Sequence, residues 1–291
     1  MGGGKVLVKA AYDYIIVSSV EEALDCLNKL DNSRIIAGGT DLVLEIEKGI
    51  RAPAVLIDVN RIPELRTISC ADDKLVIGCA APFGEIANNP VAIQQFNALA
   101  EACASVGSPQ IRNRGTIGGN FGTASAAADS ICPITAFEPE IRIYDRQGSR
   151  SITVGQLWEK DLISQAGRSI ILGSLIFDCS PKPWKSVFVK LGRREALSIA
   201  RLSLTVAVKE KGGTVAQARV AIGSAGRHPY RSQLCEESLT GKSLAKLDVE
   251  EFGSACGEVV KQVLKDRPTA PYKIRAVRGM AAEAIERLIA N

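Results

Sequence analysis

Histidine is almost absent from this sequence, which has a single one, His228, among 291 residues. A Ser-His-Asp triad needs a histidine as its general base, and histidine is the commonest metal ligand in proteins. His228 lies in the stretch RHPY, which is typical of a turn, so we expect it to pack rather than to catalyse. The histidine content therefore argues against hydrolase, nuclease and metalloenzyme functions.

Cysteine motifs are absent too, although the chain has eight cysteines. No two of them are spaced as C-x-x-C, and none lies near the histidine at a metal-ligand spacing. Scattered cysteines of this kind are usually reduced, buried thiols in a cytoplasmic protein. We therefore predict that this chain binds no zinc and no iron–sulfur cluster, and that it has no metal site.

Long apolar runs and blocks of one charge are also missing. No run approaches the roughly 18 apolar residues of a membrane span. The N-terminal stretch MGGGKVLVKAAYDYII lacks the apolar core and cleavage site of a signal peptide. The formal net charge of +4 is spread among acidic residues, which does not favour nucleic-acid binding. We expect a cytoplasmic location, no membrane span and no nucleic-acid partner.

The length and the 46% hydrophobic content suit two or three compact lobes. A first lobe begins with a helix after Ser18-Ser19, where either serine matches a capping box with Glu21 or Glu22. The apolar pattern then predicts a strand over 34–37, a helix over 42–50 and a strand over 54–58. These elements indicate a β-α-β-α-β unit.

A second lobe begins with a predicted hairpin, whose turn is 71–73. Its remaining elements are less regular in pattern. We predict helices and strands over the following ranges: strands 65–70, 74–79, 140–144 and 169–178, and helices 83–88, 91–105 and 131–137.

A third lobe begins near Pro181-Lys182-Pro183. The pattern predicts a three-stranded antiparallel sheet followed by helices, with a turn at 211–213 between the last two strands. The predicted ranges are strands 186–191, 203–209 and 217–223, and helices 232–239, 248–265 and 271–290.

Two glycine motifs stand out, IIAGGTD at 35–41 and GTIGGN at 115–120. A strand that runs into Gly-Gly leaves backbone N–H groups open to an anion, because no Cβ blocks the approach. Thr40 would add a hydroxyl donor, Asp41 would cap the next helix, and Asn120 would orient a ring or a ribose. Each motif alone could also be a simple tight turn.

The second motif lies in a long segment, 105–130, that has few bulky apolar residues. A loop this long inside a compact domain is usually functional or disordered. One glycine loop suits one phosphate, whereas two converging loops suit a pyrophosphate or a dinucleotide. Composition and spacing alone therefore indicate a nucleotide-type cofactor.

Four segments of the sequence resemble a known protein family. AGGTDL at 37–42, SPQIRNRGTIGGN at 108–120, TASAAADS at 123–130 and FVKLGRREALSIARLSLTVAV at 188–208 resemble the FAD-binding (medium) subunit of molybdenum hydroxylases, the family of xanthine dehydrogenase, nicotinate dehydrogenase and aerobic carbon monoxide dehydrogenase. The resemblance covers essentially the whole chain. It implies an α+β fold: a vanillyl-alcohol-oxidase (PCMH) type FAD domain over 1–178, with subdomains of about 1–59 and 60–178, and a C-terminal domain over 179–291.

The resemblance also implies which residues bind the FAD. The first motif would wrap the pyrophosphate through its backbone amides, and the second would form the opposite wall. Asp129 would bond a sugar or ribityl hydroxyl, Leu172 would make an apolar backbone contact, and Lys190 would lie near the flavin. The implied cofactor-binding set is Ile35, Ile36, Ala37, Gly38, Gly39, Thr40, Asp41, Leu42, Gly107, Thr116, Ile117, Gly118, Gly119, Asn120, Thr123, Ser125, Asp129, Leu172 and Lys190, with no catalytic residue.

The implied activity is that of an oxidoreductase subunit. A large subunit would carry the molybdopterin cofactor, and a small subunit would carry [2Fe–2S] clusters. Electrons would pass from those clusters to non-covalent FAD on this chain, and from the FAD to NAD or another acceptor. Neither motif contains a histidine for a covalent link. The wording of AGGTDLVLEI at 37–46 and of VGSPQIRN at 106–113 favours a purine or N-heterocycle as the substrate of the complex over carbon monoxide. A heterotrimer is expected, and the role of the loop 193–203 stays open.

Two alternatives stay open at this point. The chain could be a self-contained FAD reductase of related fold, although no proton donor for a substrate stands out. It could also be a scaffold subunit that has lost FAD, although the glycines of both motifs are intact.

Overall fold

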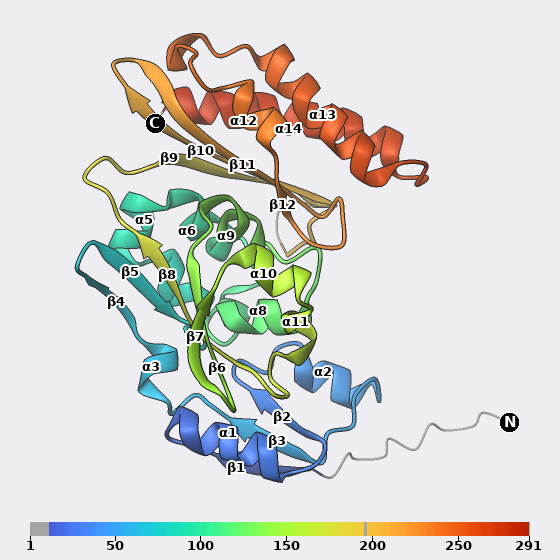
Figure 1. Ribbon diagram of the computed structural model, residues 1–291. Helices are drawn as coiled ribbons and strands as arrows, with labels where there is room; N and C mark the ends of the chain where they lie inside the picture. The colour runs from blue at the N-terminus through green and yellow to red at the C-terminus, as the bar shows by residue number, and fades with distance from the viewer. Residues whose placement is uncertain (1–11, 195–196, 291) are drawn as a thin grey trace, which may run out of the picture.

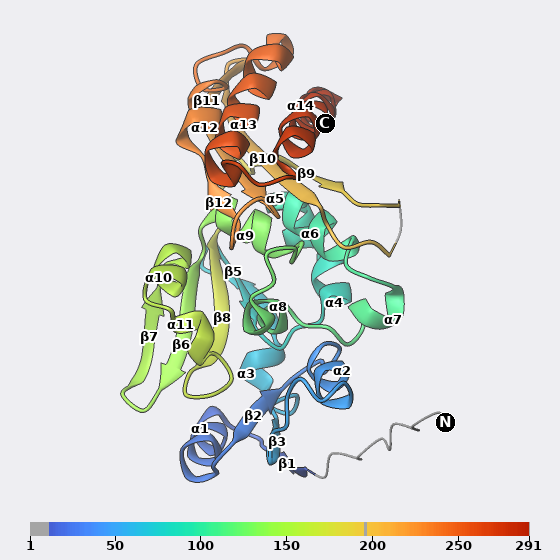
Figure 2. The same ribbon diagram turned by 90° about the vertical axis from the view of Figure 1, so that its right-hand side faces the viewer.

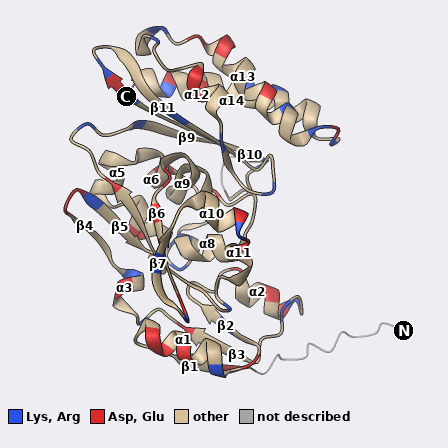
Figure 3. Ribbon diagram, in the orientation of Figure 1, with Lys and Arg blue, Asp and Glu red and all other residues tan. Residues whose placement is uncertain are grey.

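The computed structural model describes residues 12–194 and 197–290, so the N-terminal stretch and part of the loop 193–203 lie outside the described residues. Three sheets follow one another along the long axis of the molecule (Figure 1). Basic and acidic residues are interspersed along the chain (Figure 3). Within the described ranges, no helix has the length and apolar content needed to cross a membrane.

The first sheet is parallel and has the order β1-β3-β2, with strands Asp13–Ile16, Val55–Asp58 and Ser33–Ile36. Helices α1 (Val20–Lys29) and α2 (Leu42–Glu47) connect them. The Ser19 hydroxyl accepts a hydrogen bond from the Glu22 amide at 3.1 Å and so begins α1, while the Glu22 carboxylate reaches back to the Ser18 amide. The predicted β-α-β-α-β unit is confirmed.

The second sheet has the order β4-β5-β8-β6-β7 and is antiparallel. The predicted hairpin is confirmed: Asp72 and Asp73 both have positive φ at its turn. The predicted helix 91–105 is broken at Phe96, which packs edge-on against the Phe137 ring, with the ring centroids 5.1 Å apart. The elements are β4 (Ile68–Ala71), β5 (Lys74–Gly78), β6 (Glu140–Asp145), β7 (Gly148–Ile152), β8 (Ile171–Asp178), α3 (Pro63–Arg66), α4 (Phe83–Ala87), α5 (Pro90–Gln95), α6 (Asn97–Ala104), α9 (Ile131–Phe137), α10 (Val154–Glu159) and α11 (Leu162–Gln165).

The segment 105–130 is not one long loop, which corrects the sequence-based expectation. It contains two short helices, α7 (Pro109–Arg112) and α8 (Ile117–Thr123). Ser108 and Thr116 cap them, each through a side-chain oxygen that accepts an amide hydrogen bond in the first turn. The first amides of a helix have no acceptor within the helix. These two caps therefore supply acceptors that the backbone does not provide.

The third sheet has the order β12-β11-β10-β9 and is antiparallel. Besides the predicted strands it has a short edge strand, β12, that the pattern did not reveal. β10 is buried from residue 202 to residue 208, because helices cover one face of the sheet and the second lobe covers the other (Figure 2). The elements are β9 (Lys185–Leu191), β10 (Leu202–Lys211), β11 (Thr214–Gly223), β12 (Tyr230–Arg231), α12 (Gln233–Glu237), η1 (Leu244–Lys246), α13 (Val249–Leu264) and α14 (Ala270–Ala290).

Glu101 joins the second lobe to the third. Its carboxylate, on α6, accepts hydrogen bonds from the Phe188 amide on β9 at 2.8 Å and from the Arg287 guanidinium on α14 at 2.7 Å. The neighbouring Asn97 amide reaches the Ser186 carbonyl at 3.3 Å. These contacts fix the position of the C-terminal domain against the helices of the second lobe.

Replacing Glu101 with alanine should lower the free energy of unfolding by about 1–3 kcal/mol, because it leaves the Phe188 amide without its acceptor and removes the shorter ion pair of Arg287. Glu283→Ala is the matched control, since Glu283 is an exposed partner of the same arginine at 3.6 Å. Urea denaturation measures the free energy of unfolding of both variants. An equal decrease in the two would contradict the role assigned to Glu101.

Candidate functional site

An open cavity lies between the first sheet and the second lobe, with an empty volume, mouth included, of about 1030 Å³. Its walls come from the end of β2, from α2, from α8 and from the start of β8, which lie together in Figure 1. The cavity therefore spans both halves of the N-terminal domain.

The first glycine motif forms one wall of this cavity. Gly38, Gly39, Thr40 and Asp41 follow β2, and within the described part of the chain their amides donate to no backbone or side-chain acceptor. Open amides at the end of a strand form a concave set of donors for an anion. The residues present therefore fit the diphosphate of a dinucleotide.

Two glycines make this wall possible. A Cβ on Gly38 would lie 2.1 Å from the Arg114 carbonyl oxygen, which is closer than any real contact. Gly39 has a φ of +73°, in the left-handed region that glycine adopts without strain. Gly38 therefore allows its backbone to contact that of Arg114, and Gly39 turns the chain into α2.

Asp41 does not cap α2, which corrects the expectation from the sequence. Its backbone is already helical, with φ −102° and ψ −48°, and its side chain makes no capping hydrogen bond. A cap residue normally has an extended backbone, which lets its side chain reach the amides of the first turn. Asp41 instead lines the cavity.

The second glycine motif differs from the first because its amides already have acceptors. The Gly118 amide donates to the Cys79 carbonyl at 2.7 Å, and the Gly119 amide donates to the Thr116 hydroxyl at 3.1 Å. The motif is the first turn of α8, and a Cβ on Gly118 would lie 2.6 Å from the Cys79 carbonyl oxygen. Its glycines therefore allow close packing of α8 against the segment that contains Cys79. This wall offers a ligand a packing surface but no open backbone amides from Gly118 and Gly119.

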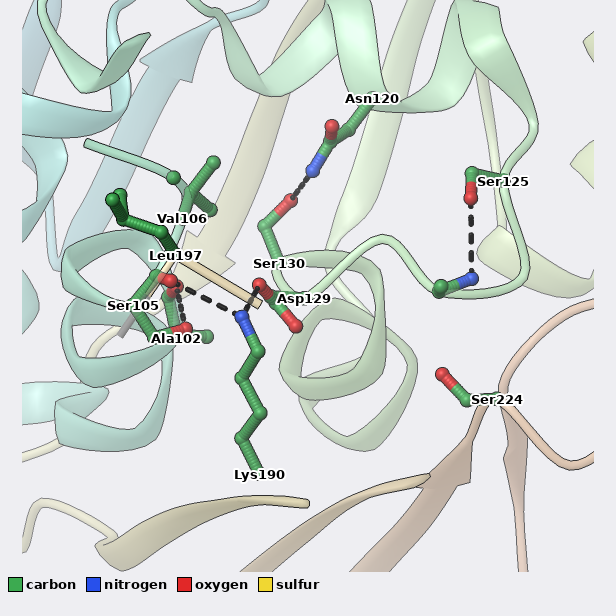
Figure 4. A network of polar contacts seen from close by, with 12 residues as sticks. Ala102, Ser105, Val106, Asn120, Ser125, Asp129, Ser130, Lys190, Leu197 and Ser224 are labelled. Carbon is green, nitrogen blue, oxygen red and sulfur yellow. Dashed lines mark hydrogen bonds and ion pairs between the residues drawn. The ribbon is translucent and has the colours of Figure 1, made fainter. Parts of the chain in front are cut away.

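A buried ion pair joins Asp129, which precedes α9, to Lys190 on β9 (Figure 4). The Lys190 ammonium is 2.5 Å from Asp129 Oδ2 and also donates to the Ser105 carbonyl at 3.1 Å. The amide of Asn120, which lines the cavity, donates to the hydroxyl of Ser130, the residue after Asp129. The ion pair is thus linked to the cavity wall through adjacent residues.

One carboxylate oxygen of Asp129 has no hydrogen-bond partner within the described residues. This oxygen, Oδ1, is buried, and the Ser105 hydroxyl donates to the Ala102 carbonyl rather than to it. Burial raises the pKa of Asp129 to about 6, although the Lys190 charge acts in the opposite direction. A buried acceptor without a donor is costly, so it favours a ligand hydroxyl at this position.

Most of the residues predicted from the sequence line the cavity. They are Ile35, Ile36, Ala37, Gly38, Gly39, Thr40, Asp41, Leu42, Thr116, Gly118, Gly119, Asn120, Thr123 and Leu172. Five others do not line it: Ile117 is in the hydrophobic core, Gly107 and Ser125 lie elsewhere, and Asp129 and Lys190 form the ion pair described above.

Sequence reasoning missed part of the lining. Gly122, which follows the second motif after Phe121, was detectable from the run GGNFG. The side chains of Arg34 and Arg51 were not, because their arrival at the cavity depends on the tertiary fold. The same holds for Gly167, whose carbonyl accepts from the Ile35 amide at 3.1 Å and so brings a distant loop to the site.

Comparison with known proteins gives two matches to family models. The model described as the FAD binding domain in molybdopterin dehydrogenase matches residues 10–176. The model described as the CO dehydrogenase flavoprotein C-terminal domain matches residues 187–288.

Individual relatives agree with these matches. The nicotinate dehydrogenase FAD-subunit of Eubacterium barkeri is 30% identical over 275 residues, covering 92% of this chain and 93% of that protein. The xanthine dehydrogenase FAD-binding subunit of Escherichia coli O157:H7 is 24% identical, covering 95% and 96%. A solved structure of carbon monoxide dehydrogenase from Hydrogenophaga pseudoflava is similar with a TM-score of 0.86 at 26% identity, covering 96% of this chain and 97% of that one.

Gly38→Ala should lower the free energy of unfolding by roughly 1–3 kcal/mol, because the new methyl group forces two touching backbones apart. It should also weaken FAD binding, since the open amides lose their positions. Gly279→Ala is the matched control, because Gly279 is an exposed residue of α14 that does not line the cavity, and its Cβ would meet no neighbouring atom within 4 Å. Urea denaturation and FAD titration measure the two effects, and a Gly38→Ala variant as stable as Gly279→Ala would contradict the packing argument.

Proposed function

Because the chain belongs to the family of FAD-binding domains in molybdopterin dehydrogenase, we propose that its FAD passes electrons between partner subunits and an external acceptor. The family membership makes the chain an FAD-binding oxidoreductase subunit of the molybdenum hydroxylases. The observation that carries the proposal is the row of open amides from Gly38 to Asp41 in a cavity that both glycine motifs line.

The first motif would hold the FAD diphosphate. Its amides lie side by side without acceptors, so a doubly charged group can take several of their hydrogen bonds at once. The surface of α8 would be the opposite wall, with Asn120 and Thr123 facing the ligand. The remaining members of the predicted cofactor-binding set are proposed as contacts in the same way.

Asp129 and Lys190 would position the isoalloxazine end. The unpartnered Asp129 Oδ1 suits a hydroxyl of the ribityl chain, and Lys190 has a third ammonium donor beyond its bonds to Asp129 and Ser105. Bound FAD would supply the exchange between one-electron and two-electron transfer, and the chain would bind and orient it. The positive charge of Lys190 would stabilise negative charge on the reduced ring.

The partners proposed for this chain are a large subunit with the molybdenum cofactor and a small subunit with [2Fe–2S] clusters, in a heterotrimer. Electrons would arrive from those clusters and leave to NAD or another acceptor. A purine or N-heterocycle is the proposed substrate of the complex, supported by the similarity to a nicotinate dehydrogenase FAD-subunit and a xanthine dehydrogenase FAD-binding subunit.

The proposed division of the chain is an FAD-binding domain over 1–178, with subdomains of about 1–59 and 60–178, and a C-terminal domain over 179–291. Three separate sheets, each with its own hydrophobic cluster, support it. A cytoplasmic location is proposed from the thiols: Cys235 and Cys256 have sulfurs 3.6 Å apart and are both free.

The purified chain should bind FAD, and an absorption spectrum taken before and after addition of FAD tests this. We expect flavin bands that remain with the protein on gel filtration and leave it on acid precipitation, because no residue of either motif provides a covalent link. A chain that takes up no FAD at any concentration would count against the proposed function. Turnover of a substrate by the isolated chain would favour a self-contained reductase instead.

Lys190→Met should make the flavin midpoint potential more negative by about 30 mV or more, the shift that about 1.4 kcal/mol produces in a two-electron couple. The reason is that the reduced ring loses a nearby positive charge. Lys185→Met is the matched control, because Lys185 is on the same strand but pairs with Glu210 at 3.4 Å. Spectroelectrochemical titration measures the potential, and equal potentials in the two variants would remove Lys190 from this role.

A further inference from the structure

A second cavity adjoins the first and is lined by arginines. Its empty volume, mouth included, is about 650 Å³. Arg34 and Arg51 line both cavities, whereas Arg168 lines only the second. The rest of its wall comes from Asn32 and from residues 50, 52 and 53. Neither glycine motif contributes to this cavity.

Three backbone segments hold the arginines together. Arg34 is on β2, whose Ile35 amide donates to the Gly167 carbonyl at 3.1 Å, which brings Arg168 alongside. On the other side, the Asn32 side chain donates to the Ala52 carbonyl at 2.7 Å, which fixes the segment that carries Arg51. Hydrogen bonds of the fold therefore place the arginines where β2 meets the segment that leads into β8.

The positive charge of this cluster is only partly compensated. Arg51 forms an ion pair with Glu45. Within the described part of the chain, the guanidinium groups of Arg34 and Arg168 have neither an acidic partner nor a hydrogen bond. Burial lowers the pKa of Arg34 to about 10; the charges of Arg168 and Arg51 act in the same direction, and the Glu45 charge acts against them.

A partly buried cation that faces two others is unfavourable unless an anion joins them. Guanidinium groups bind phosphate in a bidentate manner, and several of them around one cavity match its multiple oxygens and its charge. We propose that Arg34, Arg51 and Arg168 form a second anion site, separate from the glycine motifs, that binds a phosphate group.

Two sources could supply that phosphate. Arg34 and Arg51 also line the cavity assigned to FAD, so the FAD diphosphate could extend its contacts to them. Alternatively, the second cavity takes the phosphate of a separate molecule while FAD occupies the first. The first source rests on the proposed function, whereas the second does not.

Inorganic phosphate is the probe, titrated by calorimetry into the full chain, both without FAD and loaded with FAD. We expect binding to the chain without FAD, weakened about tenfold or more by Arg168→Gln and by Arg34→Gln, each of which removes charge-assisted hydrogen bonds. Arg275→Gln is the matched control, because Arg275 is an exposed residue of α14. Thermal unfolding of each variant shows whether it is folded.

The FAD-loaded chain distinguishes the two sources. Loss of phosphate binding, together with weaker FAD binding in Arg34→Gln, would identify the FAD diphosphate as the occupant. Phosphate binding that persists would identify a separate ligand. The site would be refuted by no phosphate binding in either form, or by equal affinities in Arg34→Gln, Arg168→Gln and Arg275→Gln. If FAD does not bind at all, the proposed function fails, but the titration without FAD still tests the anion site.

Discussion

The contact between the Gly38 backbone and the Arg114 carbonyl is the constraint on which the cavity depends. It brings the end of β2, from the first sheet, against the segment that leads into α8, from the second lobe. Nothing larger than a hydrogen atom fits between them. The residues from Gly38 to Asp41 line the cavity, and within the described residues their amides donate to no acceptor. The anion-binding wall thus results from close packing of two lobes.

The two glycine motifs look alike in sequence but have different roles in the structure. The first provides open donors, whereas the amides of the second bond to Cys79 and Thr116. Sequence could predict that both motifs line one site, because Gly-Gly after an apolar residue indicates close backbone approach. It could not show which amides stay open, since the acceptor of the Gly118 amide is the Cys79 carbonyl, which lies far earlier in the chain and comes close only in the tertiary fold.

Regular elements were easier to predict than the remainder of the site. The opening β-α-β-α-β unit, the Asp72-Asp73 hairpin and the C-terminal helices all follow from periodicity and turn residues. The missed elements, such as β12 and α11, are too short to show a period. The Asp129–Lys190 pair and the arginine cluster join residues far apart in sequence, so their pairing and burial arise only on folding.

Hydrogen–deuterium exchange with and without FAD tests directly whether the first glycine motif binds the diphosphate. We predict that FAD slows exchange of the amides from Gly38 to Asp41, which have no acceptor in the described chain, and leaves those of Gly118 and Gly119 nearly unchanged. Slower exchange at Gly118 and Gly119 with no change from Gly38 to Asp41 would contradict it, because the diphosphate would then be bound by the wall that the structure assigns to packing.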